Sequence, residues 1–64
     1  MSRFSPSVWV RRLEALGGYV MRYDGRWSWG VQIEDNLDEV QALTAEIRPP
    51  EHAAAVRQYV SGRP

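Results

Sequence analysis

The chain has 64 residues and no cysteine or lysine, and its eight arginines balance eight acidic residues to a net charge of zero. This length fits one small domain, and the missing cysteines exclude a disulfide framework and a cysteine-ligated metal site. No run approaches the ~18 apolar residues of a membrane span, and the first ten residues lack the features of a signal peptide. The sequence therefore predicts a protein of the cytoplasm of a bacterial or host cell.

The charges are distributed unevenly along the chain. Residues 1–33 have a net charge of +3, from five arginines against two acidic residues, and residues 34–64 have −3, from three arginines against six acidic residues. The sequence thus predicts a dipolar molecule. Because the whole chain is neutral, it lacks the basic footprint of typical nucleic-acid modules, and we do not expect direct binding to nucleic acid.

Residues 6–16 have the pattern of a first helix. Ser5 suits the N-cap and Pro6 the first helical position. Phe4 and Trp9 occupy the two positions of a hydrophobic staple. The apolar stripe of this helix consists of Trp9, Leu13 and Leu16. The glycine pair Gly17-Gly18 should end the helix.

Residues 19–33 alternate around Asp24-Gly25, which is a strong hairpin signal. A two-residue loop would divide the apolar residues between both faces, whereas a three-residue loop starting at Tyr23 gathers them on one face. In that case one face carries Tyr19, Met21, Trp27, Trp29, Val31 and Ile33, and the other carries Val20, Arg22, Arg26, Ser28, Gly30 and Gln32. Because the hydrophobic pattern sets register, we expect the three-residue loop, with Gly25 at positive φ and Arg22 directly opposite Arg26.

Two further helices are expected, over about 37–48 and 50–60. Asn36 and Glu39 have capping-box spacing, and Pro49-Pro50 should end one helix and start the next. The prediction is a single α+β domain over residues 1–64, in the order α-β-β-α-α. Its two-stranded antiparallel hairpin should pack on the three helices, because a lone hairpin is marginal in water.

No residue pattern indicates catalysis, so we expect no enzyme activity, cofactor, metal site or small-molecule substrate. His52, the single histidine, is interpreted as an ordinary surface residue, since no convergent ligands accompany it. Gly17-Gly18 precedes a strand rather than a helix and so lacks the geometry of a phosphate loop. A chain this short also leaves little room for a ligand pocket of the usual roughly 300–1,000 Å³.

Two surfaces are candidates for binding a partner protein. The hairpin surface carries Arg22, Arg26 and Tyr23. The acidic segment, residues 34–39 (EDNLDE), carries Glu34, Asp35, Asp38 and Glu39. The plainer interpretation is that both are solvated surfaces, and the functional one is that the acidic segment occupies a basic, nucleic-acid-binding site on another protein. Trp27 and Trp29 have the character of stacking residues for single-stranded nucleic acid, although the register favours a core role.

The pattern LEALGGYVMRYDGRWSW…LDEVQALTAEIRPPEHAAAVRQYV resembles the TubC-type docking domains of peptide and polyketide megasynthases. The matching positions are Leu13, Leu16, Gly18, Gly25, Leu43, Ile47 and Val60. The chain departs from that family in its double proline and in lacking a leucine-rich C-terminal helix. The resemblance implies a hairpin that binds a short segment at the end of a partner chain, with Arg22, Arg26 and Gln32 lining the surface.

In length, lack of cysteine and one-sided acidity, the chain is also similar to phage-encoded inhibitors of host defence, including anti-CRISPR proteins. That similarity implies a non-catalytic inhibitor, encoded by a phage or mobile element, that binds a host nucleic-acid-processing complex directly. We expect this function first, a TubC-like docking adaptor as the alternative, and a single-stranded nucleic-acid module as the third. The open edges of a two-stranded sheet also leave a homodimer open.

Overall fold

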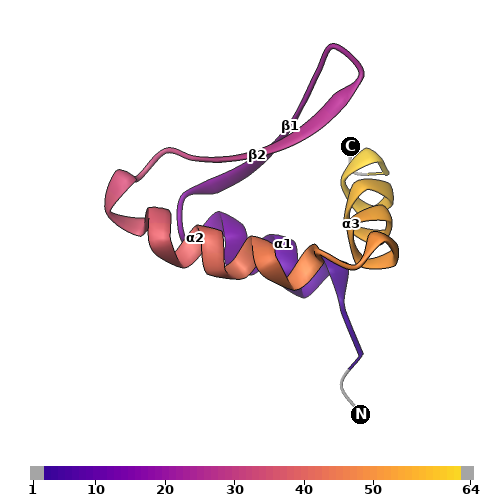
Figure 1. The fold of residues 1–64 in the computed structure, drawn as a ribbon, viewed down its shortest axis with the longest axis horizontal. Helices are drawn as coiled ribbons and strands as arrows, with labels where there is room; N and C mark the ends of the chain where they lie inside the picture. The colour runs from indigo at the N-terminus through magenta and orange to yellow at the C-terminus, as the bar shows by residue number, and fades with distance from the viewer. Residues whose placement is uncertain (1–2, 63–64) are drawn as a thin grey trace.

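Three helices and one antiparallel hairpin follow one another in the order α-β-β-α-α, which confirms the predicted α+β class. The computed structural model describes residues 3–62. Its elements are α1 (Pro6–Ala15), β1 (Gly18–Tyr23), β2 (Arg26–Val31), the 3-10 turn η1 (Glu34–Asn36), α2 (Leu37–Thr44), the 3-10 turn η2 (Ala45–Ile47) and α3 (Pro50–Ser61). In Figure 1, α1 and α2 run in opposite directions across the molecule, α3 stands across one end of the pair, and the turn of the hairpin extends clear of the helices.

The first helix begins and ends close to the predicted residues. Ser5 is the N-cap, and its carbonyl accepts a 3.0 Å hydrogen bond from the amide of Trp9. The Ser5 hydroxyl does not cap the helix but lies 3.3 Å from the hydroxyl of Ser7. The chain leaves the helix through Gly17, whose φ of +77° is the left-handed conformation that glycine adopts most readily.

The second helix begins at Leu37, as predicted, but its end and its capping interaction differ from the prediction. The α-helical part stops at Thr44, and the chain tightens into η2 before Pro49, which has no backbone N–H to continue the helical hydrogen bonds. The predicted capping box at Asn36 is wrong. The Asn36 side chain instead donates a 3.0 Å hydrogen bond to the carbonyl of Leu16, which joins the start of α2 to the end of α1.

The buried core lies among the helices. In residues 3–62 the buried hydrophobic side chains are Trp9, Val10, Leu13, Val40, Leu43, Ile47 and Val56, all from helical segments. Trp9 donates its indole N–H to the carbonyl of Leu43 at 3.0 Å, which gives this buried polar group a partner. The hairpin covers the core through Val20, Trp29 and Val31, which are partly buried, and Trp29 meets Trp9 edge-on at 5.3 Å.

The hairpin closes through a two-residue loop, so the predicted three-residue loop is wrong. Tyr23 pairs with Arg26, and the loop residues Asp24 and Gly25 have φ values of +53° and +74°. Two positive φ values in the loop are typical of a type I′ turn, whose twist matches that of the flanking strands and which Asp-Gly sequences favour. The positive φ of Gly25 is confirmed, but turn geometry, not the clustering of apolar residues, sets the register.

This register moves several residues to the opposite face from the one predicted. The inner face, toward the helices, carries Gly18, Val20, Arg22, Trp27, Trp29 and Val31. The outer face carries Tyr19, Met21, Tyr23, Arg26, Ser28 and Gly30. The prediction placed Tyr19 and Met21 inside and Val20 outside, and the structure reverses these placements. The predicted pairing of Arg22 with Arg26 is also wrong, because Arg22 lies opposite Trp27.

Candidate functional site

The outer face of the hairpin carries three large exposed side chains at alternate positions of β1, here called the outer row. Tyr19 is 37% exposed, Met21 42% and Tyr23 76%. Their partners across the strand pair are Gly30, Ser28 and Arg26 respectively. The Tyr19 ring lies over Gly30, where an added Cβ would collide with it. On the outer face, β1 therefore carries large aromatic and thioether side chains, and the neighbouring positions of β2 include the small residues Ser28 and Gly30.

Both edges of the hairpin direct backbone groups away from the strand pair. In a hairpin closed by a two-residue loop, the residue pair next to the loop is hydrogen-bonded and the pairs alternate from there. Val20 and Arg22 on β1, and Trp27 and Trp29 on β2, thus point their N–H and C=O groups outward. Within residues 3–62, none of the backbone hydrogen bonds outside the helices and the strand pair involves these four residues.

The inner side of the hairpin near its loop holds a cation and an aromatic ring. The guanidinium carbon of Arg22 lies 6.0 Å from the centroid of the Trp27 ring, at the limit of a cation–π contact. Trp27 and Trp29 are both half-buried, and Trp29 packs against Trp9. The two tryptophans therefore do not form an exposed stacking platform.

The acidic segment lies at the far end of β2. Glu34 and Asp35 belong to η1, Asp38 and Glu39 to the first turn of α2, and all four side chains are exposed. Ion pairs within residues 3–62 do not include any of them. The same stretch exposes two apolar side chains, Ile33 at 49% and Leu37 at 45%. Ile33, predicted for the apolar strand face, lies beyond the end of β2 and covers Gly17.

The structure does not bring the two predicted surfaces together. Arg22, Tyr23 and Arg26 lie at the loop end of the hairpin, and the acidic segment follows its other end. A six-residue strand spans about 20 Å, and Figure 1 shows the loop and the start of α2 at opposite ends of the hairpin. The acidic segment and the two arginines of the hairpin surface thus lie at opposite ends of the hairpin. Each surface would contact a partner separately.

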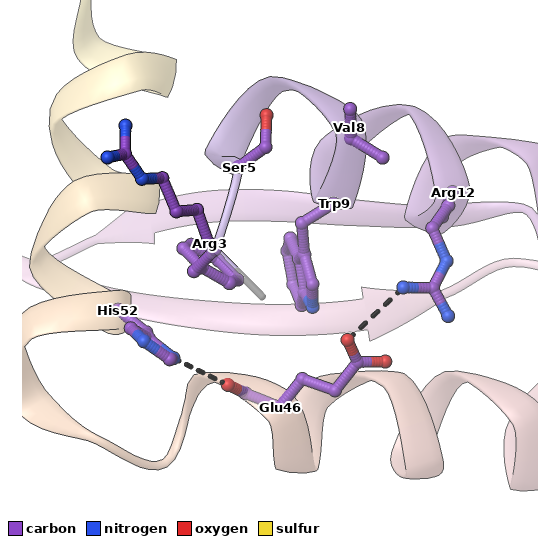
Figure 2. A pocket seen from close by; sticks show the side chains of 8 residues that line it. Arg3, Ser5, Val8, Trp9, Arg12, Glu46 and His52 are labelled. Atoms are coloured by element: carbon purple, nitrogen blue, oxygen red, sulfur yellow. Dashed lines mark hydrogen bonds and ion pairs between the residues drawn. The ribbon is translucent and has the colours of Figure 1, made fainter. Parts of the chain in front are cut away.

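A pocket of about 420 Å³ opens between the N-terminal segment, α1 and the junction of η2 with α3. Its lining residues are Arg3, Phe4, Ser5, Val8, Trp9, Arg12, Glu46 and His52, as Figure 2 shows. The expectation that so short a chain has little room for a ligand pocket is therefore wrong. The sequence offers no local signal for this pocket, because its walls come from segments more than 30 residues apart.

Two polar interactions and a ring stack hold the pocket walls together. His52 is half-buried rather than simply exposed, and its ring stacks on Phe4 with centroids 4.3 Å apart and planes 8° apart. Its Nδ1 lies 3.0 Å from the carbonyl oxygen of Glu46. A carbonyl only accepts, so Nδ1 carries the hydrogen and donates it. Arg12 Nη1 meets Glu46 Oε1 at 3.1 Å (Figure 2).

The described part of the chain, residues 3–62, holds no group of three or more histidine, aspartate or glutamate side chains placed to bind a metal ion. None of the helices in that range combines the length and apolarity that crossing a membrane requires. The features that remain are the outer row, the acidic segment and the pocket. Comparison of the chain with protein-family models, curated proteins and solved structures gave no match.

Proposed function

We propose that this chain is a small protein-binding domain that acts without catalysis and contacts its partner through the outer face of the hairpin. The observation that carries the proposal is the exposure of Tyr19, Met21 and Tyr23 in one row beside Arg26. Tyrosine, methionine and arginine are enriched at the centres of protein interfaces, whereas aspartate and glutamate are depleted there. The composition of this face therefore favours it over the acidic segment as the main contact.

The open edge of β1 gives this surface a mode of binding. An extended partner segment can pair with the outward backbone groups of Val20 and Arg22 and extend the sheet by one strand. Alternate side chains of that segment would then lie beside the outer row. Arg22 and Arg26 favour a segment that carries acidic residues. This is the docking-adaptor function that the resemblance to TubC-type domains implies.

The test compares two variants that differ in position but match in exposure. Met21→Glu places a charge in the outer row, and Leu37→Glu places one in the acidic segment, at 42% and 45% exposure respectively. Tagged wild-type protein and both variants are used to capture partners from a bacterial lysate, with identification by mass spectrometry. A synthase chain terminus retained by wild type and Leu37→Glu but lost with Met21→Glu supports the proposal. Equal retention by all three proteins contradicts it.

A second candidate function rests on the acidic segment. There, four exposed carboxylates are neighbours in sequence of the exposed side chains of Ile33 and Leu37, so the segment is both acidic and apolar. Such a surface fits an inhibitor of the anti-CRISPR type that covers a basic nucleic-acid site on its target. Reversing Asp35, Asp38 and Glu39 to lysine should then abolish capture of a nucleic-acid-processing complex. Reversal of Arg22 and Arg26 to glutamate should leave that capture intact.

A further inference from the structure

The pocket in Figure 2 is separate from both surfaces considered above. It is built by residues 3–5, by one side of α1, and by Glu46 and His52 from the η2–α3 junction. Its volume of about 420 Å³ lies within the range of small-molecule sites. The stack of Phe4 on His52 and the Arg12–Glu46 pair fix walls that belong to distant parts of the chain.

The charged residues that line the pocket are Arg3, Arg12 and Glu46. The Arg12 guanidinium lies beside the Glu46 carboxylate, whereas the Arg3 guanidinium points toward α3 and away from that pair (Figure 2). Arg12 uses one nitrogen to reach Glu46, and its side chain is 55% exposed. A guanidinium has five N–H donors in a planar fork that matches a carboxylate, so Arg12 keeps donors for a ligand.

Apart from Ser5 and His52, the remaining lining is apolar. Phe4 presents its ring on one side, and Val8, 44% exposed, lies on the adjacent turn of α1. Trp9 is only 1% exposed, so it closes the floor instead of offering a face to a ligand. A ligand with an apolar body and a planar ring fits these walls, and a single negative charge on that ligand can reach Arg12 at the rim.

We propose that this pocket binds a small aromatic carboxylate, with the carboxylate on the free donors of Arg12 and the ring beside Phe4 and Val8. Glu46 both anchors Arg12 and repels the incoming carboxylate. This ligand site goes beyond the proposed protein-binding function and does not depend on it, since no residue of the outer row lines the pocket.

The experiment follows the backbone amide signals of the full chain by NMR during titration with 3-phenylpropanoate. A second titration with 3-phenylpropanamide, which has the same ring and chain length but no charge, is the control. The expected result is saturable shifts at Val8, Arg12 and His52 with the carboxylate, and at least about tenfold weaker binding of the amide, because charge-assisted hydrogen bonds are the stronger ones. Equal affinities for the two probes, or no saturable shifts at millimolar concentrations, would overturn the proposal.

Two variants that break the same ion pair separate a ligand role from a structural one. Arg12→Gln should weaken binding of the carboxylate about fivefold or more, because it removes the group that holds it. Glu46→Gln should strengthen binding, because it removes the competing carboxylate and frees Arg12. If both variants weaken binding equally, the pair only shapes the pocket and the proposal is wrong. Arg11→Gln, at the exposed neighbour of Arg12 that does not line the pocket, is the matched control and should leave the affinity unchanged.

Discussion

The register of the hairpin decides which residues a partner can reach, and neighbouring substitutions on β1 test it. Val20 packs against the core on the inner face, and Met21, the next residue, is 42% exposed on the outer face. Val20→Lys should destabilise the domain and Met21→Lys should not. In the three-residue register, which the structure contradicts, the two effects would be exchanged.

The expected magnitude follows from burial. Full burial of a valine side chain contributes about 1.5–3 kcal/mol to the free energy of unfolding. Val20 is only partly buried, so its burial contributes about half of this. Placing an ammonium group near the core adds to the loss, so we expect Val20→Lys to cost about 1–2 kcal/mol. In a domain of this size each kcal/mol lowers Tm by about 4–8 °C. An exposed substitution such as Met21→Lys should stay within about 0.5 kcal/mol.

The assay is thermal unfolding followed by far-UV circular dichroism, with both variants measured beside the wild type in one buffer. A drop in Tm of about 4–16 °C for Val20→Lys, with about 4 °C or less for Met21→Lys, supports the register. If Met21→Lys lowers Tm as much as Val20→Lys or more, the outer row is not exposed as described. The protein-binding proposal would then lose the observation that carries it.

Two other substitutions test the core and the turn that orients the hairpin. Trp9→Phe removes the donor to the Leu43 carbonyl and leaves it buried without that partner, so it should cost about 1–3 kcal/mol in the free energy of unfolding, measured in urea. Gly25→Ala meets open space but forces alanine to a φ of +74°, so it should cost about 1–2 kcal/mol in the same assay. Gly18→Ala tests packing instead of backbone strain, because its added methyl would collide with Leu13, and overpacking of this kind costs about 1–3 kcal/mol.

The helices could be predicted because their signals are local. Pro6, Gly17 and Pro50 mark helix ends through their own backbone preferences, and each stands at or next to an observed end. The spacing of Trp9 and Leu13 likewise predicts a buried stripe, and both are buried. None of these inferences needs information from another part of the chain.

The hydrophobic pattern alone does not determine the hairpin register, because two local rules disagreed. Clustering of apolar residues favoured the long loop, and the Asp24-Gly25 pair favoured the short one. The helices already supply the buried hydrophobic core of the described residues, so the hairpin need not gather all of its apolar residues on one face. The Asp-Gly preference for a type I′ turn was the signal that would have identified the outer row.

The pocket was beyond sequence reasoning for a different reason. Its walls depend on the approach of Phe4 to His52 and of Arg12 to Glu46. These pairs are 48 and 34 residues apart, and no motif links their members. Only the packing of α1 against the η2–α3 junction brings them together.

The hydrogen bond from Asn36 to the carbonyl of Leu16 has a consequence for how the molecule can be altered. Together with the 2.9 Å bond from the amide of Gln32 to the carbonyl of Gly17, it fastens the entry and exit of the hairpin to each other. The hairpin is therefore held at its base by these two bonds and along its inner face by Val20, Trp29 and Val31, and only its loop end extends clear of the helices. Turns of other lengths and sequences can be grafted at the loop end, beyond Val20 and Trp29, and recognition can be redesigned there while the packing of the inner face on the helices is kept.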